Sequence, residues 1–315
     1  MTDEPPASQG AAGAAWTEER GTSDEGRKRL KSGPEASGKT EPGGEREDRA
    51  SGVAVVVGAT GAIGQAVIRR LTRRGLPVVA VARGKAGLDE LASDCDLVTP
   101  CPADIGSNDA IQAIGAALTG LDGLDGLDGL NGLNGLNGTV RMAVFAAGLP
   151  VRGSADSIDP DALAAGSNIK AGGLLRLLHA VRDRLVPGSR FVTFAGSLGL
   201  EPRAHEAGPG AVNAAVFNLM RQISLLYGPR GVTTHTLSPG PADTPRLRRI
   251  VAAVAAERGA AEEEVWQEYV AQNSLGRLPT ADELAWAVEL LLDPEADVLH
   301  GSVLYLDAGG HRGIH

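Results

Sequence analysis

The chain has 315 residues, 43% of them hydrophobic and only 3% aromatic, which is enough for a sizeable core of alanine, valine and leucine. The formal net charge of −9 argues against nucleic acid and anionic membrane surfaces as main partners. No apolar run could span a bilayer, and the two cysteines, Cys95 and Cys101, match no metal or redox spacing. We therefore expect a cytoplasmic protein that holds no metal.

Residues 1–50 consist of glycine, alanine, serine, proline and mixed charges, with hardly any large apolar side chain. Such a segment buries too little surface to offset the entropy that ordering costs. We predict a disordered tail, followed by a single domain over residues 51–315.

The next stretch predicts a strand, a tight turn and a helix. Five apolar residues, 53–57, lead into glycines at 58, 61 and 64, and an apolar helical pattern covers residues 62–74. Glycine at these places permits a sharp turn, the approach of a diphosphate and close packing of helix on strand. The helix N-terminus would offer free N–H groups to the phosphates. This context favours a nucleotide site over a merely glycine-rich turn.

A strand over 77–82 ends at Arg83, with Lys85 close by. In a dinucleotide-binding fold an acid at this place takes the ribose 2′-hydroxyl of NAD, whereas a basic residue accommodates the 2′-phosphate of NADP. Arg83 therefore favours NADP(H); a solvated basic loop is the alternative.

After a helix over 86–93 and a strand over 96–101, Asp104 could cap the following turn or accept from the adenine amino group.

Residues 120–138, which follow a helix over 107–118, repeat Gly-Leu-Asp three times and then Gly-Leu-Asn three times. Glycine at every third position opposes a helix, and without proline the pattern is not that of collagen. We predict a flexible surface insertion, and expect that deleting the tail and shortening this repeat leaves the melting temperature close to that of the parent.

Strands and helices alternate through the rest of the chain. This alternation predicts a doubly wound, Rossmann-like parallel sheet of about seven strands, with the ligand crevice at the carboxyl ends of the strands. The polar-apolar stretch 244–274 is predicted to form a helical lid over a substrate. The remaining strands are expected at 140–146, 190–195, 232–237 and 302–306, and the remaining helices at 160–185, 209–227 and 281–292.

Several short segments occur in a fixed order along the chain: the glycine turn, Asp104, Ala146-Ala147-Gly148, Asn168, Pro239-Gly240 with Thr244, Gly276-Arg277, Gly301, and Asp307 with Gly309-Gly310. Over residues 53–310 this order resembles the short-chain dehydrogenase/reductase family, in which Asn-Asn-Ala-Gly is the counterpart of Ala146-Ala147-Gly148. Val57 departs mildly, because many members have threonine there, and the glycine spacing is that of the extended and atypical branches.

The resemblance implies a nicotinamide cofactor, which Arg83 indicates to be NADP(H), a small-molecule substrate and a homodimer or homotetramer. The positions that it assigns to the cofactor are Gly58, Thr60, Gly61, Ile63, Gly64, Arg83, Asp104, Ala147, Gly148, Asn213, Pro239, Gly240 and Thr244.

The reaction of that family is hydride transfer between nicotinamide and a carbonyl or alcohol, served by Asn, Ser, Tyr and Lys. Alignment of Ala214-Ala215-Val216 places Pro209 at the tyrosine and Asn213 at the lysine. Gly196 takes the serine position, with Ser197 one step beyond, and Asn168 matches outright. Proline has no proton to give, and general acid catalysis is worth roughly 10²–10⁴-fold.

Of the residues that could replace the missing acid, Lys170 is set aside because of its direction, and Tyr269 and His205 remain. Lys170 is two positions from Asn168 on one helix, so we expect the two side chains to diverge. Tyr269 could approach a substrate from the 244–274 stretch, and His205 could act as an acid near neutral pH. We assign Asn168, Ser197 and His205 to the catalytic site, although a loop histidine is more often merely solvated.

Three functions fit these residues. The first is an NADPH-dependent reductase of a quinone or polyaromatic, polyketide-like carbonyl compound, which stabilises its own anion and needs no Tyr/Lys proton relay. The second is a nucleotide-binding pseudoenzyme without turnover, and the third is a non-redox lyase or cyclase on the same fold.

Overall fold

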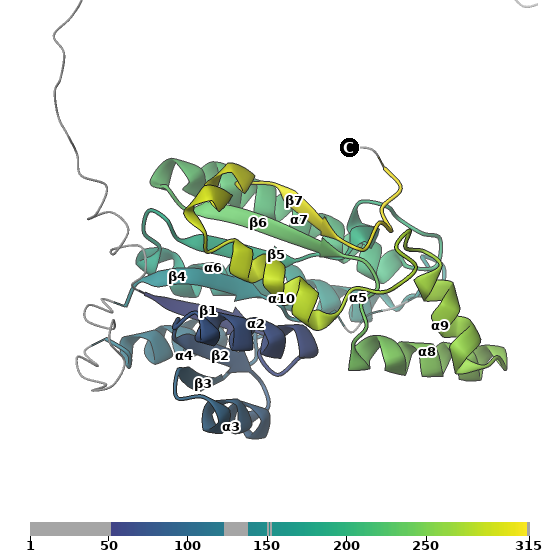
Figure 1. Cartoon of the computed structure of the whole chain (residues 1–315), viewed down its shortest axis with the longest axis horizontal. Coiled ribbons are helices and arrows are strands. Elements are labelled where there is room, and N and C mark those ends of the chain that lie inside the picture. The colour runs from purple at the N-terminus through teal and green to yellow at the C-terminus, as the bar shows by residue number, and fades with distance from the viewer. Residues whose placement is uncertain (1–51, 123–137, 150, 152, 314–315) are drawn as a thin grey trace, which may run out of the picture. The chain divides into compact units, whose positions relative to one another are not determined.

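A parallel seven-stranded sheet forms the centre of the computed structural model, which describes residues 52–122, 138–149, 151 and 153–313 (Figure 1). Its order is β3-β2-β1-β4-β5-β6-β7, so the direction of winding reverses between β1 and β4. The predicted doubly wound, Rossmann-like fold is confirmed. The strands are β1 (Val53–Val57), β2 (Val78–Ala82), β3 (Val98–Pro102), β4 (Val140–Phe145), β5 (Arg190–Phe194), β6 (Thr233–Pro239) and β7 (Val303–Leu306).

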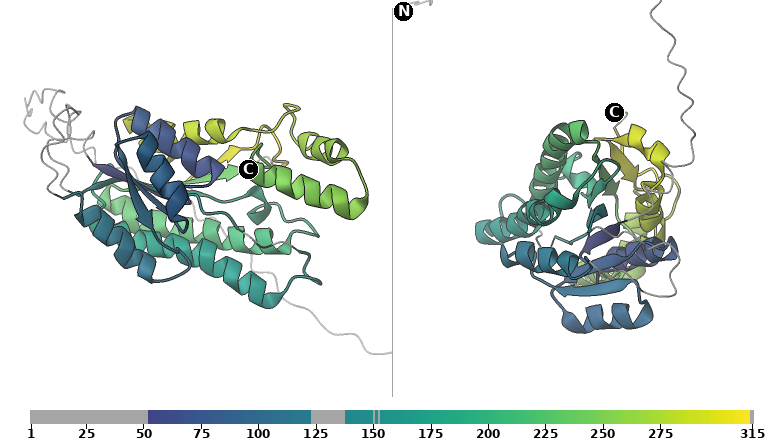
Figure 2. Two further views of the ribbon diagram at one scale, coloured as in Figure 1. Left: turned by 90° about the horizontal axis from the view of Figure 1, so that it is seen from below. Right: turned by 90° about the vertical axis from the view of Figure 1, so that its left-hand side faces the viewer.

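Helices cover both faces of the sheet, as the two views of Figure 2 show. α2 and α10 pack together on one face, while α4, α6 and α7 cover the other. The helices are α2 (Ala62–Arg73), α3 (Lys85–Asp94), α4 (Asp109–Thr119), α5 (Pro160–Ser167), α6 (Gly173–Val181), α7 (Ala207–Tyr227), α8 (Pro245–Arg258), α9 (Glu262–Val270) and α10 (Ala281–Leu290).

The central strands consist mainly of β-branched and small apolar residues because they are buried from both sides. All five residues of β1 are buried, and its side chains alternate between the two faces. Val53, Val55 and Val57 join the core under α4, α6 and α7. Ala54 and Val56 join the core under α2 and α10. This double burial fixes the register of β1 against β2 and β4.

Two predicted helices differ from the structure. The helix expected over 160–185 comprises α5, one π-helical turn at Asn168–Gly172 (η1), α6, and a short 3-10 turn at Arg182–Arg184 (η2). The stretch 244–274 contains two helices, because Gly259 ends α8 in a left-handed conformation with φ of 64°. α8 and α9 pack against each other around their own small apolar cluster.

The predicted tail, residues 1–50, lies outside the described residues, as does most of the repeat, residues 123–137. The two ends of that insertion are described, and Arg184 joins them. Its guanidinium donates to both carboxylate oxygens of Asp122, at 2.9 and 2.8 Å, and to the Gly138 carbonyl at 3.0 Å. Within the described residues, no helix combines the length and apolar character that crossing a membrane requires.

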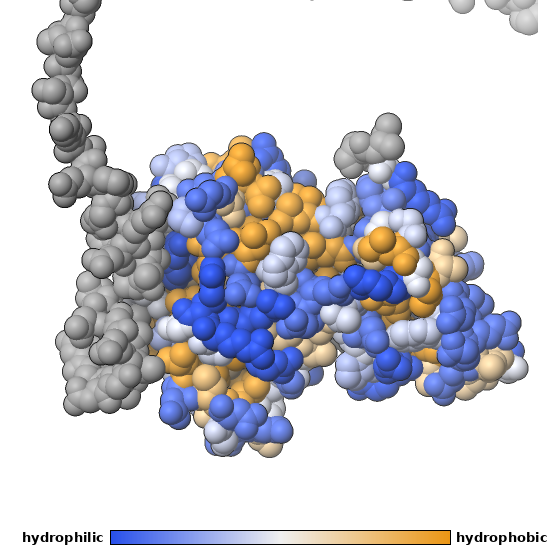
Figure 3. Space-filling model, in the orientation of Figure 1, coloured by the Kyte–Doolittle hydropathy of each residue, from blue (hydrophilic) through white to orange (hydrophobic). Residues whose placement is uncertain are grey.

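An ion-pair network joins α2 to α10 at the surface, where Figure 3 shows a hydrophilic band over these helices. Arg70 of α2 bonds Asp282 at 2.6 Å and Glu289 at 2.7 Å. Arg74 bonds Asp293 at 2.7 Å. The capping box of Thr280 and Glu283 fixes the start of α10, so its acidic side chains meet α2.

Candidate active site

The glycine turn between β1 and α2 is closed by backbone contacts that leave no room for side chains. Gly58 has φ of 84°, and a Cβ there would lie 2.8 Å from the backbone of Ala146 and Ala147. At Gly64 a Cβ would lie 2.2 Å from the carbonyl oxygen of Gly58. The turn therefore depends on glycine at both ends.

The middle of this turn remains open for an anionic group. Gly61 is the N-cap of α2 and has no side chain that could cap the helix. No capping side chain therefore hydrogen-bonds the N–H groups of the first turn. Thr60 beside it is exposed. This arrangement fits a cofactor diphosphate, which would accept from these N–H groups and gain from the helix dipole.

Arg83 and Asp104 follow neighbouring strands on the same side of the turn. Arg83 is exposed directly after β2, and within the described part of the chain no group hydrogen-bonds its guanidinium. Asp104 follows β3, and its Oδ1 accepts the N–H of Gly106 at 2.9 Å, which is the turn-capping role.

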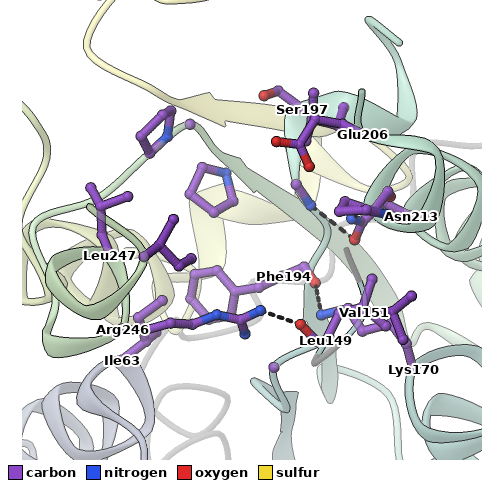
Figure 4. A pocket seen from close by; sticks show the side chains of 18 of the residues that line it. Ile63, Leu149, Val151, Lys170, Phe194, Ser197, Glu206, Asn213, Arg246 and Leu247 are labelled. Atoms are coloured by element: carbon purple, nitrogen blue, oxygen red, sulfur yellow. Dashed lines mark hydrogen bonds between the residues drawn. The ribbon is translucent and has the colours of Figure 1, made fainter. Parts of the chain in front are cut away.

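A cavity of about 320 Å³ lies at the carboxyl ends of the central strands (Figure 4). Of the predicted site residues, it brings together Ile63, Ala147, Gly148, Ser197, Asn213, Pro239 and Gly240. Leu149, Val151, Phe194, Leu198, Leu247 and Ile250 make much of its wall apolar. The last two come from α8, which places the predicted lid at the cavity, and Tyr269 of α9 also lines it.

Pro209 and Asn213 both line this cavity from the first turns of α7. The Asn213 amide is committed to the protein backbone. Its Oδ1 accepts the N–H of Gly196 at 3.1 Å, and its Nδ2 donates to the Pro209 carbonyl at 2.8 Å. Asn213 therefore positions the chain after β5, where Ser197 begins a short 3-10 turn.

Lys170 is the charged group deepest in the cavity wall. Its side chain leaves the π turn, and its Nζ donates to the carbonyl of Phe194 at 2.6 Å (Figure 4). The same Nζ donates to the carbonyl of Ala147 at 3.0 Å. Burial, and secondly the positive charge of Arg246, lower the pKa of Lys170 from 10.5 to about 7. Arg246 reaches across the cavity from α8 and hydrogen-bonds the Leu149 carbonyl.

Residues 58–311 match a family model described as enoyl-(acyl carrier protein) reductase. The short-chain reductase protein NovJ of Streptomyces niveus is 25% identical over 260 residues, which cover 82% of this chain and 93% of NovJ. The chain belongs to the short-chain dehydrogenase/reductase family.

Another relative in this family is cis-4-hydroxycyclohexanecarboxylate dehydrogenase of Sinomonas cyclohexanicum. It is 30% identical over 132 residues, which cover 42% of this chain and only 49% of that enzyme. A solved structure of an actinorhodin polyketide ketoreductase variant with NADPH has a TM-score of 0.73 at 23% identity, covering 84% of this chain and 99% of that one. That likeness confirms the fold.

Apart from the residues of the glycine turn, Arg83 and Asp104, three predicted residues lie outside the cavity lining: Asn168 and Thr244, which the family pattern assigns, and the loop residue His205. Asn168 donates from Nδ2 to the Gly106 carbonyl at 2.8 Å, and its Oδ1 accepts from Arg176 at 2.7 Å. His205 is exposed and lines a neighbouring hollow that shares Glu206 and Tyr269 with the main cavity. Thr244 caps α8 by accepting the N–H of Leu247 at 3.3 Å.

Sequence reasoning missed two cationic residues of this short-chain dehydrogenase/reductase site, Lys170 and Arg246. Lys170 does diverge from Asn168, as expected, but it is Lys170 whose side chain enters the cavity. The one sequence signal for Lys170 was a lysine within an apolar stretch that has few charges. The π turn that sets the direction of its side chain has no sequence signature of its own.

Proposed function

We propose that this chain is an NADPH-dependent reductase of a quinone or polycyclic, polyketide-like carbonyl compound. The observation that carries the proposal is the apolar cavity at the ends of β4, β5 and β6, which begins at Ile63 of the glycine turn. An apolar acceptor in this cavity would lie against the nicotinamide end of a cofactor held on that turn.

Arg83 supports NADPH rather than NADH as the reductant. It is exposed at the end of β2, where a 2′-phosphate would lie, and no acid stands at that place in the sequence. The related structure of actinorhodin polyketide ketoreductase contains NADPH, and another related structure is that of an NADPH-dependent reductase in bacilysin biosynthesis. These relatives support the same cofactor here.

The reaction that we propose does not use the Tyr/Lys relay of the family, because Pro209 and Asn213 occupy those two positions of the resemblance. Hydride addition to a simple ketone leaves a localised alkoxide, which needs a strong proton source. Hydride transfer to one oxygen of a quinone leaves a phenolate at the other oxygen, whose charge is delocalised over the ring. A substrate of the second kind therefore suits this site, in which Ser197 can donate to the accepting oxygen.

The test has two stages. NADPH and NADH are first titrated against the protein by cofactor fluorescence; NADPH oxidation is then followed with quinones, fused-ring ketones and simple ketones. We expect tighter binding of NADPH and faster turnover of the first two classes than of simple ketones. Gly61→Asp, which places a negative charge beside the diphosphate, is the control and should abolish both binding and turnover.

A second candidate is a nucleotide-binding subunit without turnover. It is favoured by the Asn213 amide, which is committed to the backbone, and by the proline at position 209. Tight NADPH binding without oxidation by any carbonyl compound in the panel would favour this candidate, or a non-redox lyase or cyclase, over the reductase.

A further inference from the structure

Lys170 combines deep burial with the absence of a counter-ion. It is 5% exposed, and no carboxylate pairs with it among the described residues. Its two acceptors are backbone carbonyls at the carboxyl ends of β4 and β5, and its Nζ lies 5.5 Å from the centroid of the Phe145 ring. An ammonium ion has three donors, so one N–H remains for the cavity that Lys170 lines.

A lysine in this position is costly for the fold. Burying an ammonium without a carboxylate opposes folding, whereas methionine would fill the same space without that cost. Such a group in the wall of a cavity is a candidate for chemistry rather than for stability.

The charged and titratable groups that face the cavity come from three elements. They are Arg246 on α8, Tyr269 on α9, and Arg203 and Glu206 immediately before α7. Arg246 is the one whose charge acts on Lys170, and it disfavours the ammonium form further. A proton on Lys170 is therefore held weakly and close to neutral pH, as a general acid requires.

We propose that Lys170 is a catalytic residue, whose Nζ donates the proton to the substrate oxygen at the ends of β4 and β5. This inference rests on the proposed carbonyl reduction. NADPH, when bound, would supply hydride, which forms a C–H bond at the carbonyl carbon of a ketone or an O–H bond at one oxygen of a quinone. The C=O π bond breaks, and the electron pair goes to the ketone oxygen or, through the ring, to the other quinone oxygen. That oxygen then takes a proton from the ammonium of Lys170, which becomes a neutral amine and regains its proton from water.

The first experiment compares the pH dependence of kcat in the parent, Lys170→Met and Lys170→Arg. An acid must be protonated to act, so kcat of the parent should fall as pH rises through about 7. Both variants should lose roughly 10²–10⁴-fold in kcat and show no such inflection, because methionine has no proton and arginine does not release one. Arg182→Met, an exposed change beyond the other end of α6, should behave as the parent does.

The second experiment does not depend on turnover. Limited reductive methylation with formaldehyde and cyanoborohydride modifies only neutral amines, and the chain has five lysines, so peptide mass spectrometry assigns each site. At pH 7.5 we expect faster modification at Lys170 than at the exposed Lys85, and protection of Lys170 by NADPH.

The outcomes separate the two proposals. A parent that oxidises NADPH with a quinone while Lys170→Met retains its kcat would overturn the role of Lys170 and leave the reductase intact. Slower modification at Lys170 than at Lys85 would also overturn it. A parent that transfers no hydride would remove the reductase and, with it, the reaction in which Lys170 acts.

Discussion

Arg83 is the residue that we expect to decide between NADPH and NADH. Arg83→Ala should weaken NADPH binding roughly 10- to 100-fold, since a hydrogen bond to a charged group is worth about 1.5–3 kcal/mol, and should leave NADH binding nearly unchanged. Fluorescence titration of both cofactors measures the difference. Equal losses for the two cofactors would show that Arg83 does not contact the 2′-phosphate.

The glycines of the turn differ in what they contribute. Gly64→Ala places a Cβ 2.2 Å from the Gly58 carbonyl oxygen, so the backbone must shift. We expect this variant to lose about 1–3 kcal/mol of stability and also to lose NADPH binding. Gly61→Ala has only one contact, at 3.3 Å, so stability should change little while NADPH binding is weakened by the methyl group. Thermal unfolding and cofactor titration distinguish them; equal stability losses would contradict this division.

At the scale of residues, sequence could predict the glycines but not the lysine. Gly58 and Gly64 follow from a geometric requirement that only one residue type meets. The direction of Lys170 depends instead on the phase of its helix, and the π turn at Asn168–Gly172 alters that phase. The partners of Lys170, two carbonyls at distant strand ends, meet only in the folded sheet.

At the scale of elements, the contact between α2 and α10 joins two ends of the chain. Arg70 bonds Asp282 and Glu289, and its side chain is 21% exposed. Arg70→Met should cost about 1 kcal/mol, and high salt should reduce that cost. The exposed pair Lys85–Asp89 within α3 is the control, where Lys85→Met should cost at most about 0.5 kcal/mol. Urea unfolding at two salt concentrations measures both; equal costs would argue against the bridging role of Arg70.

The strands were predictable because most are short apolar runs that alternate with helical patterns, and their bounds agree within two residues. Their parallel pairing follows from the intervening helices. The breaks within the helices were harder to predict from the sequence. Gly259 ends α8 in the middle of a pattern that reads as continuous, because a glycine that adopts positive φ is not marked by its neighbours.

At the scale of the whole molecule, we expect stability toward acid to depend in part on a histidine in the sheet, His235. Burial and the nearby charge of Arg190 lower the pKa of His235 from 6.5 to about 4. Between these values the unfolded chain binds the proton and the folded protein does not, so stability that is complete above pH 6.5 is lost as pH falls toward 4. The loss is on the order of 3 kcal/mol.

His235→Gln should therefore show a smaller fall in unfolding free energy between pH 7 and pH 4.5 than the parent. The exposed His179→Gln is the matched control and should follow the parent. Urea unfolding at a series of pH values gives the comparison, and parallel curves for His235→Gln and the parent would refute the assignment.

The insertion between α4 and β4 is closed at its base by Arg184. Because Asp122 and Gly138 are already joined there, replacing residues 123–137 by a short glycine-serine turn should change the melting temperature by only a few degrees. Arg184→Met should lower stability more than that replacement does. Differential scanning calorimetry of the two variants tests the order, and the reverse order would show that the repeat itself contributes to stability.

The position of that base has a practical consequence. Gly138 precedes the amino end of β4, whereas the cavity lies at the carboxyl ends of the strands, which are the opposite edge of a parallel sheet. A surface linker or reporter protein inserted between Asp122 and Gly138 would project from the edge of the sheet opposite the cavity. Protein immobilised through this point would present the mouth of its cavity to the solution, where large polycyclic molecules could reach it.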